Sequence, residues 1–406
     1  MFLRNGKVGI FDLTSGQASE EEFEEPIEWD KLSSIDAANG LAEEHGMDSI
    51  VLGTGVLTGS FVPASCAGII RVKPDLDGRP RLMPLLGYAG FELKLSGFDF
   101  IVIKGMAREP GYLWVRDGII EHVKAPKLTS RDSWGRTDAI REEQGDSKIQ
   151  VLAVGPWGDA KHSQAQLLNS YWGGEDKAGI ASEFGRKNLL AVAIRGMGEL
   201  ELAEPEGHFE DAMLLMREQI VKLGANSGLG SYSEVGRRGD FERLTHRHVG
   251  CYGCPFPCRT YLKLQSSGNE LRASSEEPGY LHYDVPALER AFGSGLDAAS
   301  ATSAFIACAR AGADPWAVLK WASEIDTKMS LGVVKQVLAD PVDKRYSLIE
   351  HVPGNFEASF SDGDTYLRCL GLGLCPRYWS KVGFDQLEVA SFATNLLGRT
   401  FPEDSA

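Results

Sequence analysis

Four cysteines in the chain have the residue type and the spacing of an iron–sulfur site. Cys251, Cys254 and Cys258 form a C-x2-C-x3-C triplet, and Cys375 stands much later in the segment LGLGLCPRYW. Four cysteine thiolates are the soft ligands that hold a [4Fe–4S] core. We therefore predict that these four residues ligate one such cluster.

Two other uses of these cysteines are weaker. A structural zinc site usually shows two CxxC pairs rather than this triplet. A disulfide framework is disfavoured because seven cysteines is an odd number and the N-terminal stretch shows no secretion signal, so we expect a reducing cytoplasm. Three cysteines remain. Cys369 is an alternative fourth ligand, Cys66 is read as a small buried thiol rather than a cluster contact, and Cys308 is read as helix core.

The charge of the chain limits its partners. The 406 residues have a net charge of −15, which argues against nucleic acid and anionic membranes because both require a basic face. No apolar run approaches the roughly 20 residues that span a bilayer. We expect a cytoplasmic protein that forms an oligomer, with no membrane span.

The elements that must position the cysteines change character midway along the chain. The first half has short apolar runs bounded by Gly, Pro and Asp, with Asp117-Gly118 as a hairpin signal. The acidic segment 18–32 is interpreted as a solvated helix start or loop.

After Gly196 the apolar spacing becomes helical, with Asp297 and Asp314 as expected N-caps and Pro315 at a first helical position. We predict an α+β protein: a two-sheet, β-rich domain at 1–203, followed by mainly helical, cluster-binding domain(s) at 204–406.

Several stretches together resemble the aldehyde:ferredoxin oxidoreductase family, whose members contain tungsten bound to two pterins. The resemblance covers nearly the whole chain in order. It is clearest in GTGVLTGSFVPAS (53–65), GFELKLSGFDFIVIKGMAREPGYLWVRDG (90–118), VLAVGPWGDA (151–160) and FGRKNLLAVAIRG (184–196). The cysteine triplet and the later GLC match the cluster ligands of the family, which places Cys375 ahead of Cys369. The resemblance implies a β-rich pterin-binding domain and a cluster near a buried tungsten- or molybdenum–pterin centre.

The pterin half of the family pattern is eroded, and the chain is shorter than family enzymes. Ala67 replaces an arginine that lies between cluster and pterin, Pro84 replaces a magnesium-binding asparagine, and Leu370 replaces a pterin-binding aspartate. Leucine accepts no hydrogen bond, which would leave buried donors unpaired at roughly 1–3 kcal/mol each. The pterin-binding residues that remain by resemblance are Lys177 and Asp314. Whether a pterin is bound at all stays open at this point.

No catalytic residue can be assigned from the sequence. His246 and His248 precede the triplet and are read as solvated loop histidines rather than proton relays. Acidic and aromatic residues after the triplet could include a general acid–base, with a solvated loop as the equal alternative; these are Glu276, Glu277, Tyr280, His282, Tyr283 and Asp284. Arginines around the triplet could stabilise an anionic cluster, attract an acidic carrier or form ordinary surface ion pairs; they are Arg237, Arg238, Arg243, Arg247 and Arg259.

Two functions follow. The first is a family oxidoreductase that oxidises an aldehyde or related carbonyl compound and passes electrons through the [4Fe–4S] cluster to a ferredoxin-like carrier or an iron–sulfur partner subunit. The second is a non-catalytic homologue that serves as an electron-transfer or scaffolding subunit beside a full-length catalytic partner. A zinc-bound interaction module is a minor third.

Overall fold

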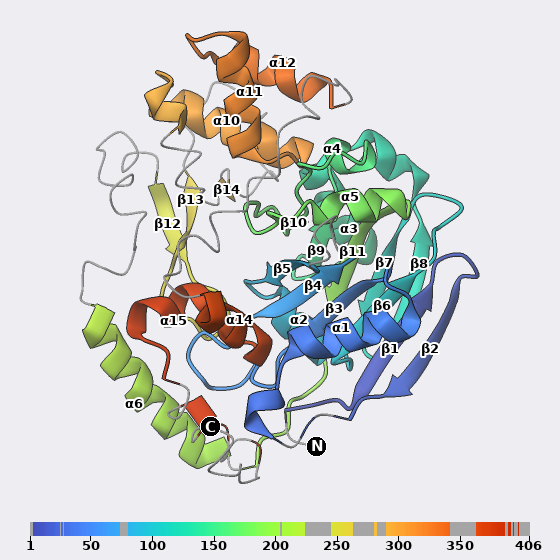
Figure 1. Ribbon diagram of the computed structural model, residues 1–406, viewed down its shortest axis with the longest axis vertical. Coiled ribbons are helices and arrows are strands. Elements are labelled where there is room, and N and C mark those ends of the chain that lie inside the picture. The colour runs from blue at the N-terminus through green and yellow to red at the C-terminus, as the bar shows by residue number, and fades with distance from the viewer. Residues whose placement is uncertain are drawn as a thin grey trace.

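The computed structural model places most of the chain. It describes residues 3–24, 26, 28–73, 80–203, 205–223, 245–262, 280–281, 290–341, 363–385, 389–390, 393 and 397. Figure 1 shows two sheets beside each other in the N-terminal half, with helices from the C-terminal half packed against one end and one side of them.

The first sheet is mixed and has the strand order β2-β1-β6-β3-β4-β5. Its strands are β1 (Lys7–Asp12), β2 (Gln17–Glu22), β3 (Ile50–Thr54), β4 (Gly68–Val72), β5 (Arg81–Leu85) and β6 (Phe100–Lys104). β1 and β6 run parallel, and the other neighbouring pairs are antiparallel. β3 and β4 are buried along their whole length, as expected for strands with both faces covered.

One prediction for this sheet was wrong. The start of the acidic segment, expected as a loop or helix start, forms β2, which pairs with β1 from Lys7↔Glu22 to Asp12↔Gln17. All six of its residues are exposed. Because this strand lies at the edge of the sheet, its carboxylates stay in water and its charge also discourages pairing with other chains.

The second sheet has the order β10-β9-β11-β7-β8. Its strands are β7 (Gly111–Arg116), β8 (Ile119–Lys124), β9 (Gln150–Ala153), β10 (Leu168–Asn169) and β11 (Leu189–Arg195). The predicted hairpin is confirmed: β7 and β8 pair through a turn in which Asp117 and Gly118 have φ values of 40° and 80°. Positive φ at both positions is the requirement of the type I′ turn.

Short helices connect and cover the two sheets. They are η1 (Trp29–Lys31), α1 (Ser34–His45), α2 (Ala89–Leu95), η2 (Pro126–Ser130), α3 (Ser133–Gln144), α4 (Pro156–Asp159) and α5 (Ile180–Arg186). α1 packs on the first sheet and α3 on the second, whereas α2 and α5 contact strands of both sheets. The two sheets therefore share one core.

The described residues of the C-terminal half are mainly helical, which confirms the predicted α+β class. Its elements are α6 (Pro205–Leu223), β12 (Thr245–Val249), β13 (Arg259–Leu262), β14 (Tyr280–Leu281), α10 (Ala298–Ala311), α11 (Pro315–Ile325), α12 (Leu331–Ala339), α14 (Gly363–Leu372) and α15 (Pro376–Val382). Asp297 and Asp314 cap α10 and α11 as predicted. The small antiparallel sheet β12-β13-β14 was not predicted. The domain division at 203/204 stays a prediction.

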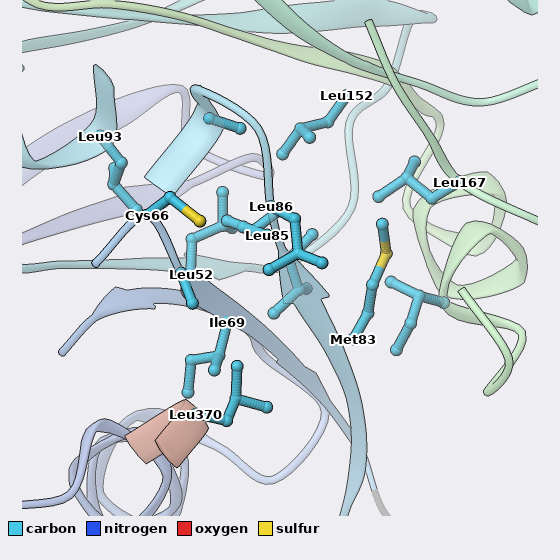
Figure 2. Packing of buried hydrophobic residues seen from close by; sticks show 14 of the residues in the cluster. Leu52, Cys66, Ile69, Met83, Leu85, Leu86, Leu93, Leu152, Leu167 and Leu370 are labelled. Atoms are coloured by element: carbon cyan, nitrogen blue, oxygen red, sulfur yellow. The ribbon is translucent and has the colours of Figure 1, made fainter. Parts of the chain in front are cut away.

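A continuous apolar core reaches from the first sheet to the C-terminal helices. α14 contacts β4 and α1, and α15 contacts α6, so the two C-terminal helices lie between α6 and the first sheet (Figure 1). Figure 2 shows Leu85 and Leu86 close to Leu52 and Cys66, and Leu370 of α14 beside Ile69 of β4. This packing fixes the place of the segment that follows α14, which contains Cys375.

Candidate cluster site

The cysteine triplet occupies the loop of a hairpin. β12 and β13 pair antiparallel through Val249↔Arg259, and the loop between them contains all three residues. Cys251 and Cys258 are buried, and Cys254 is half-buried. The hairpin holds both ends of the loop, so the three thiols remain close together.

The fourth predicted cysteine reaches the same place from the other side. Cys375 is the N-cap residue of α15 and is buried. Cys369 is also buried, but it lies within α14, where burial and the nearby Cys375 thiol raise its pKa. The structure thus brings Cys375 to the triplet, although the assignment of cluster ligands stays a prediction.

The thiols interact with one another. Burial and the neighbouring Cys375, Cys251 and Cys258 thiols raise the pKa of Cys254. Burial raises the pKa of Cys258 to about 11, against the opposing effect of Arg377. Thiolates that are buried close together repel one another, and a bound cation relieves this repulsion. The donor set therefore fits a cluster that takes several thiolates at once.

The spacing of these thiols does not suit a closed zinc site. Among the residues that the structure describes, Glu21, Glu44 and His45 are the only group of three or more possible ligands whose atoms all lie within 4.8 Å of one another. Thiolates around one zinc at about 2.3 Å would all fall within that distance. The cysteines are spread more widely, as the corners of a larger core require.

A loop of the first domain joins the two cysteine-bearing segments. The backbone N–H of Ala64 donates to the carbonyl of Gly253 at 2.9 Å, and the carbonyl of Ala64 accepts from Cys375 N–H at 2.9 Å. Ala67 N–H donates to the carbonyl of Gly373 at 3.0 Å. The site is therefore built from three segments that are distant in sequence.

Replacing Gly55 with alanine should disturb this junction. A Cβ there would stand 2.1 Å from Gly373 N and 2.2 Å from Leu372 C, both backbone atoms that cannot rotate away. We expect the free energy of unfolding to fall by about 1–3 kcal/mol, with loss of bound iron. Urea denaturation and iron analysis measure both. Gly40→Ala is the control, since a Cβ in this exposed part of α1 meets nothing within 4 Å. A stable, iron-replete Gly55→Ala protein would contradict the close approach.

A buried ion pair borders the thiols and escaped the sequence analysis. Arg259, the residue after Cys258, donates to Glu175 Oε1 at 2.5 Å, and both side chains are buried. Burial opposes the charge of the guanidinium, but Glu175 and the Cys251 and Cys258 thiols hold the pKa of Arg259 above its usual value. Of the alternatives for the arginines around the triplet, burial excludes a surface ion pair for Arg259 and leaves it as an internal positive charge beside two of the cysteines.

Gly87 allows Arg259 to reach this position. Gly87 has φ +77°, and a Cβ there would lie 2.5 Å from the Arg259 Nη1 atom. The guanidinium also lies 5.2 Å from the centre of the Trp172 ring. The signal that could have pointed to Arg259 is its position directly after a cysteine of the triplet.

The two predicted pterin residues lie together and bind each other. Lys177 Nζ is 2.8 Å from Asp314 Oδ2, and Gln166 Nε2 donates to the same oxygen at 2.8 Å. Asp314 also caps α11 by accepting from Ala317 N–H. Gln164, whose carbonyl accepts from Asp314 N–H, has a buried side-chain nitrogen with no acceptor among the described residues. Lys177, Asp314 and Gln164 therefore offer charged and amide groups to a polar ligand.

The other expected pterin contacts are occupied or apolar. In the loop that contains Lys177, the Asp176 carboxylate accepts from the amides of Ala178, Ile180 and Ala181, so these donors are already used. Pro84 pairs within the first sheet opposite Ile69. Leu370 is fully buried in the apolar core (Figure 2). Lys177 and Asp314 therefore fit a pterin, whereas Pro84, Leu370 and the amides bound by Asp176 do not.

The remaining predicted residues fall largely outside the structure described. His246 and His248 lie in β12 rather than in a loop, and Arg247 and Tyr280 lie in β12 and β14. The others lie outside the described residues: Arg237, Arg238, Arg243, Glu276, Glu277, His282, Tyr283 and Asp284. Cys308 is buried in α10, as predicted.

Fold and site together define an α+β protein with a buried group of thiols between a two-sheet domain and C-terminal helices. Residues 10–196 match the family described as aldehyde ferredoxin oxidoreductase, N-terminal domain. A tungsten-containing aldehyde ferredoxin oxidoreductase of Pyrococcus abyssi is 31% identical over 309 residues, which is 66% of this chain and 50% of the relative. The chain belongs to the aldehyde ferredoxin oxidoreductase family, as the sequence resemblance predicted.

A further relative and a solved structure are also similar to this chain. The aliphatic sulfonate oxidoreductase, WOR-like subunit, of Pyrococcus furiosus is 26% identical over 344 residues, covering 69% of this chain and 52% of the relative. A solved structure, the active site complex BamBC of benzoyl coenzyme A reductase with 1,5-dienoyl-CoA, has a TM-score of 0.65 at 17% identity and covers 97% of this chain and 65% of that chain. That likeness supports the fold. The chain spans about half the length, or less, of several curated relatives it matches.

Proposed function

We propose that this chain is a redox protein of its family that binds a [4Fe–4S] cluster through Cys251, Cys254, Cys258 and Cys375. The observation that supports this most directly is the meeting of the triplet and Cys375 in one buried place. The wide spacing of the thiols favours a multi-iron core over one metal ion. In this proposal the substrate is an aldehyde or related carbonyl compound, whose electrons leave through the cluster.

The residues of this chain would act on the cluster through charge and exclusion of water. The guanidinium of Arg259 lies close enough to Cys251 and Cys258 to stabilise negative charge on them. A nearby positive charge favours the reduced cluster, which has one more electron. Burial of Cys251, Cys258 and Cys375 keeps solvent from most of the core. These features suit a centre that stores and passes single electrons.

A tungsten–pterin centre, as in the names of the relatives, would supply the two-electron oxidation of the substrate. Of the groups that the structure describes, Lys177, Asp314 and Gln164 are those that would hold its polar edge. The amides bound by Asp176 would have to exchange partners to bind a phosphate. The number of pterins bound per chain therefore has to be measured directly.

The electron acceptor in this proposal is a ferredoxin-like carrier or an iron–sulfur partner subunit. A relative named as a subunit and a structural neighbour solved as a two-component complex support a multi-subunit setting. Among the described residues, no helix is both long enough and apolar enough to cross a membrane.

A second candidate is a non-catalytic homologue that keeps the cluster as an electron relay or serves as a scaffold. The burial of Leu370 in the apolar core and the occupied amides near Asp176 are the observations that favour it. The electron relay shares the cluster with the oxidoreductase and lacks the pterin, whereas a scaffold needs neither.

Metal and pterin counts on anaerobically purified protein should separate these functions. We expect about four iron per chain, with tungsten or molybdenum and pterin fluorescence after oxidative extraction if the chain is the oxidoreductase. Four iron per chain without pterin would support the electron-relay function instead. Zinc in place of iron would overturn the cluster, and two pterins per chain would show that the eroded motifs still bind the full cofactor.

A further inference from the structure

A group of possible metal ligands without any cysteine lies on the first sheet. It consists of Glu21 on the edge strand β2 and of Glu44 and His45, the last two residues of α1. One ligand atom from each residue lies within 4.8 Å of the other two. Nitrogen and oxygen ligands around one ion, at about 2.1 Å from it, fall within that distance of one another. The three side chains can therefore reach a single ion.

Strand pairing and the end of the helix bring these residues together. β2 pairs with β1 along its whole length, and side chains alternate between the two faces of a strand. Glu21 therefore points to the opposite face from Glu20 and Glu22, and it meets His45 there. Helix α1 ends at His45, so Glu44 and His45 are held by its last turn. Elements on both sides of the group fix its place.

The imidazole of His45 gives a second, independent indication of a ligand. Its side chain is only 9% exposed, and its Nε2 atom has no hydrogen-bond partner among the described residues. The Glu21 Oε2 atom is 3.1 Å from Nε2, but it lies off the direction that an N–H bond would take, so the two atoms form no hydrogen bond. Two ligand atoms of one zinc ion are roughly 3.0–3.4 Å apart at bond angles of about 90–109°. The separation therefore fits a shared ion, which a neutral imidazole binds through this nitrogen.

The local charge also favours a cation. All six residues of β2 are exposed, and three consecutive glutamates end the strand, so their carboxylates repel one another. The C-terminal end of a helix such as α1 has a partial negative charge, which attracts cations to its last turn. A divalent ion held by Glu21 and Glu44 would neutralise both carboxylates.

We propose that Glu21, Glu44 and His45 bind one divalent transition-metal ion, of the zinc or manganese type, which ties the edge strand β2 to the end of α1. One imidazole nitrogen and two carboxylates are ligands that suit such ions. Both glutamates are exposed, so water fills the remaining positions around the ion. The site shares no residue with the proposed cluster and does not depend on it.

The test titrates the full chain, purified without oxygen, with Mn²⁺ and follows the unbound ion by electron paramagnetic resonance. Manganese is the probe because thiolates are poor ligands for it, so the cysteines do not compete. We expect about one Mn²⁺ per chain, displaced by the more tightly bound Zn²⁺. In His45→Ala and Glu44→Gln the affinity should fall at least about tenfold, since even the loss of a group that only supports a ligand typically costs that much. Glu43→Gln is the matched control, because it removes the charge of an exposed neighbour outside the group.

A second measurement is the melting temperature, which Mn²⁺ should raise in the wild type and in Glu43→Gln but not in the ligand variants. A wild-type protein that binds no Mn²⁺ would overturn the site and leave only an ion pair between Glu21 and His45. Equal binding by wild type, Glu43→Gln and His45→Ala would show an adventitious ion only, held by the acidic surface, and would overturn it as well. If His45→Ala does not fold, Glu21→Gln removes a ligand from the exposed edge strand without changing α1, and unchanged binding in that variant would have the same consequence.

Discussion

Replacing Cys375 with serine should strip iron from the protein, whereas replacing Cys369 with serine should leave the iron in place. The two residues lie close in sequence, are both buried, and lose the same sulfur atom in the substitution. They differ in where the structure puts them. The backbone of Cys375 is bonded to Ala64, which is bonded in turn to Gly253 in the triplet loop, whereas Cys369 lies within α14.

The expected size of the effect follows from the chemistry of the cluster. Serine is a poor ligand for an iron–sulfide core, so loss of one of four thiolates should reduce the count from about four iron per chain to three or fewer. Iron and sulfide analysis and the visible absorbance of anaerobic protein provide the measurement. Cys308→Ser, a buried cysteine in α10, is the matched control for the loss of a buried thiol.

The opposite result would be equally informative. If Cys369→Ser lost iron and Cys375→Ser kept it, the fourth ligand would be Cys369. If both variants stayed brown with unchanged iron, these residues would hold no cluster and the site would have to be abandoned.

Local signals predicted what depends on neighbours in sequence. Asp117-Gly118 formed its hairpin turn, and Asp297 and Asp314 capped their helices, because each of these patterns is completed within a few residues. The resemblance to the family pointed to the triplet and to the GLC segment as cluster ligands. These two segments lie together in the fold. The strand β2 was missed because an edge strand needs no apolar residues, only a partner, and β1 provides it.

Long-range contacts explain what could not be predicted. The positions 259 and 175 are separated by 84 residues, so nothing in either segment indicates the ion pair. The same holds for the segment around Cys66, because Ala64 and Ala67 bond to two loops that are distant in sequence. Polar residues at such positions become functional candidates only when the packing is known.

The buried pair of Glu175 and Arg259 should give the largest effect on stability. Glu175→Gln would remove the one carboxylate that pairs directly with the buried guanidinium of Arg259 among the described residues. Removal of one partner from a buried ion pair typically costs about 3–5 kcal/mol. We expect a loss of that size in the free energy of unfolding, measured by urea denaturation of anaerobic protein, together with faster loss of the cluster.

Two further variants show whether the pair itself is responsible. Glu20→Gln breaks an exposed ion pair with Lys7, where both side chains are about half exposed, and should cost less than about 1 kcal/mol. The double variant Glu175→Leu with Arg259→Met removes both charges and should regain most of the lost stability, because apolar groups of similar size can replace a buried pair. Its reduction potential should nevertheless fall, since the positive charge beside Cys251 and Cys258 is gone. A Glu175→Gln protein as stable as the wild type would show that water reaches Arg259, and the proposed internal charge beside the cluster would then have to be given up.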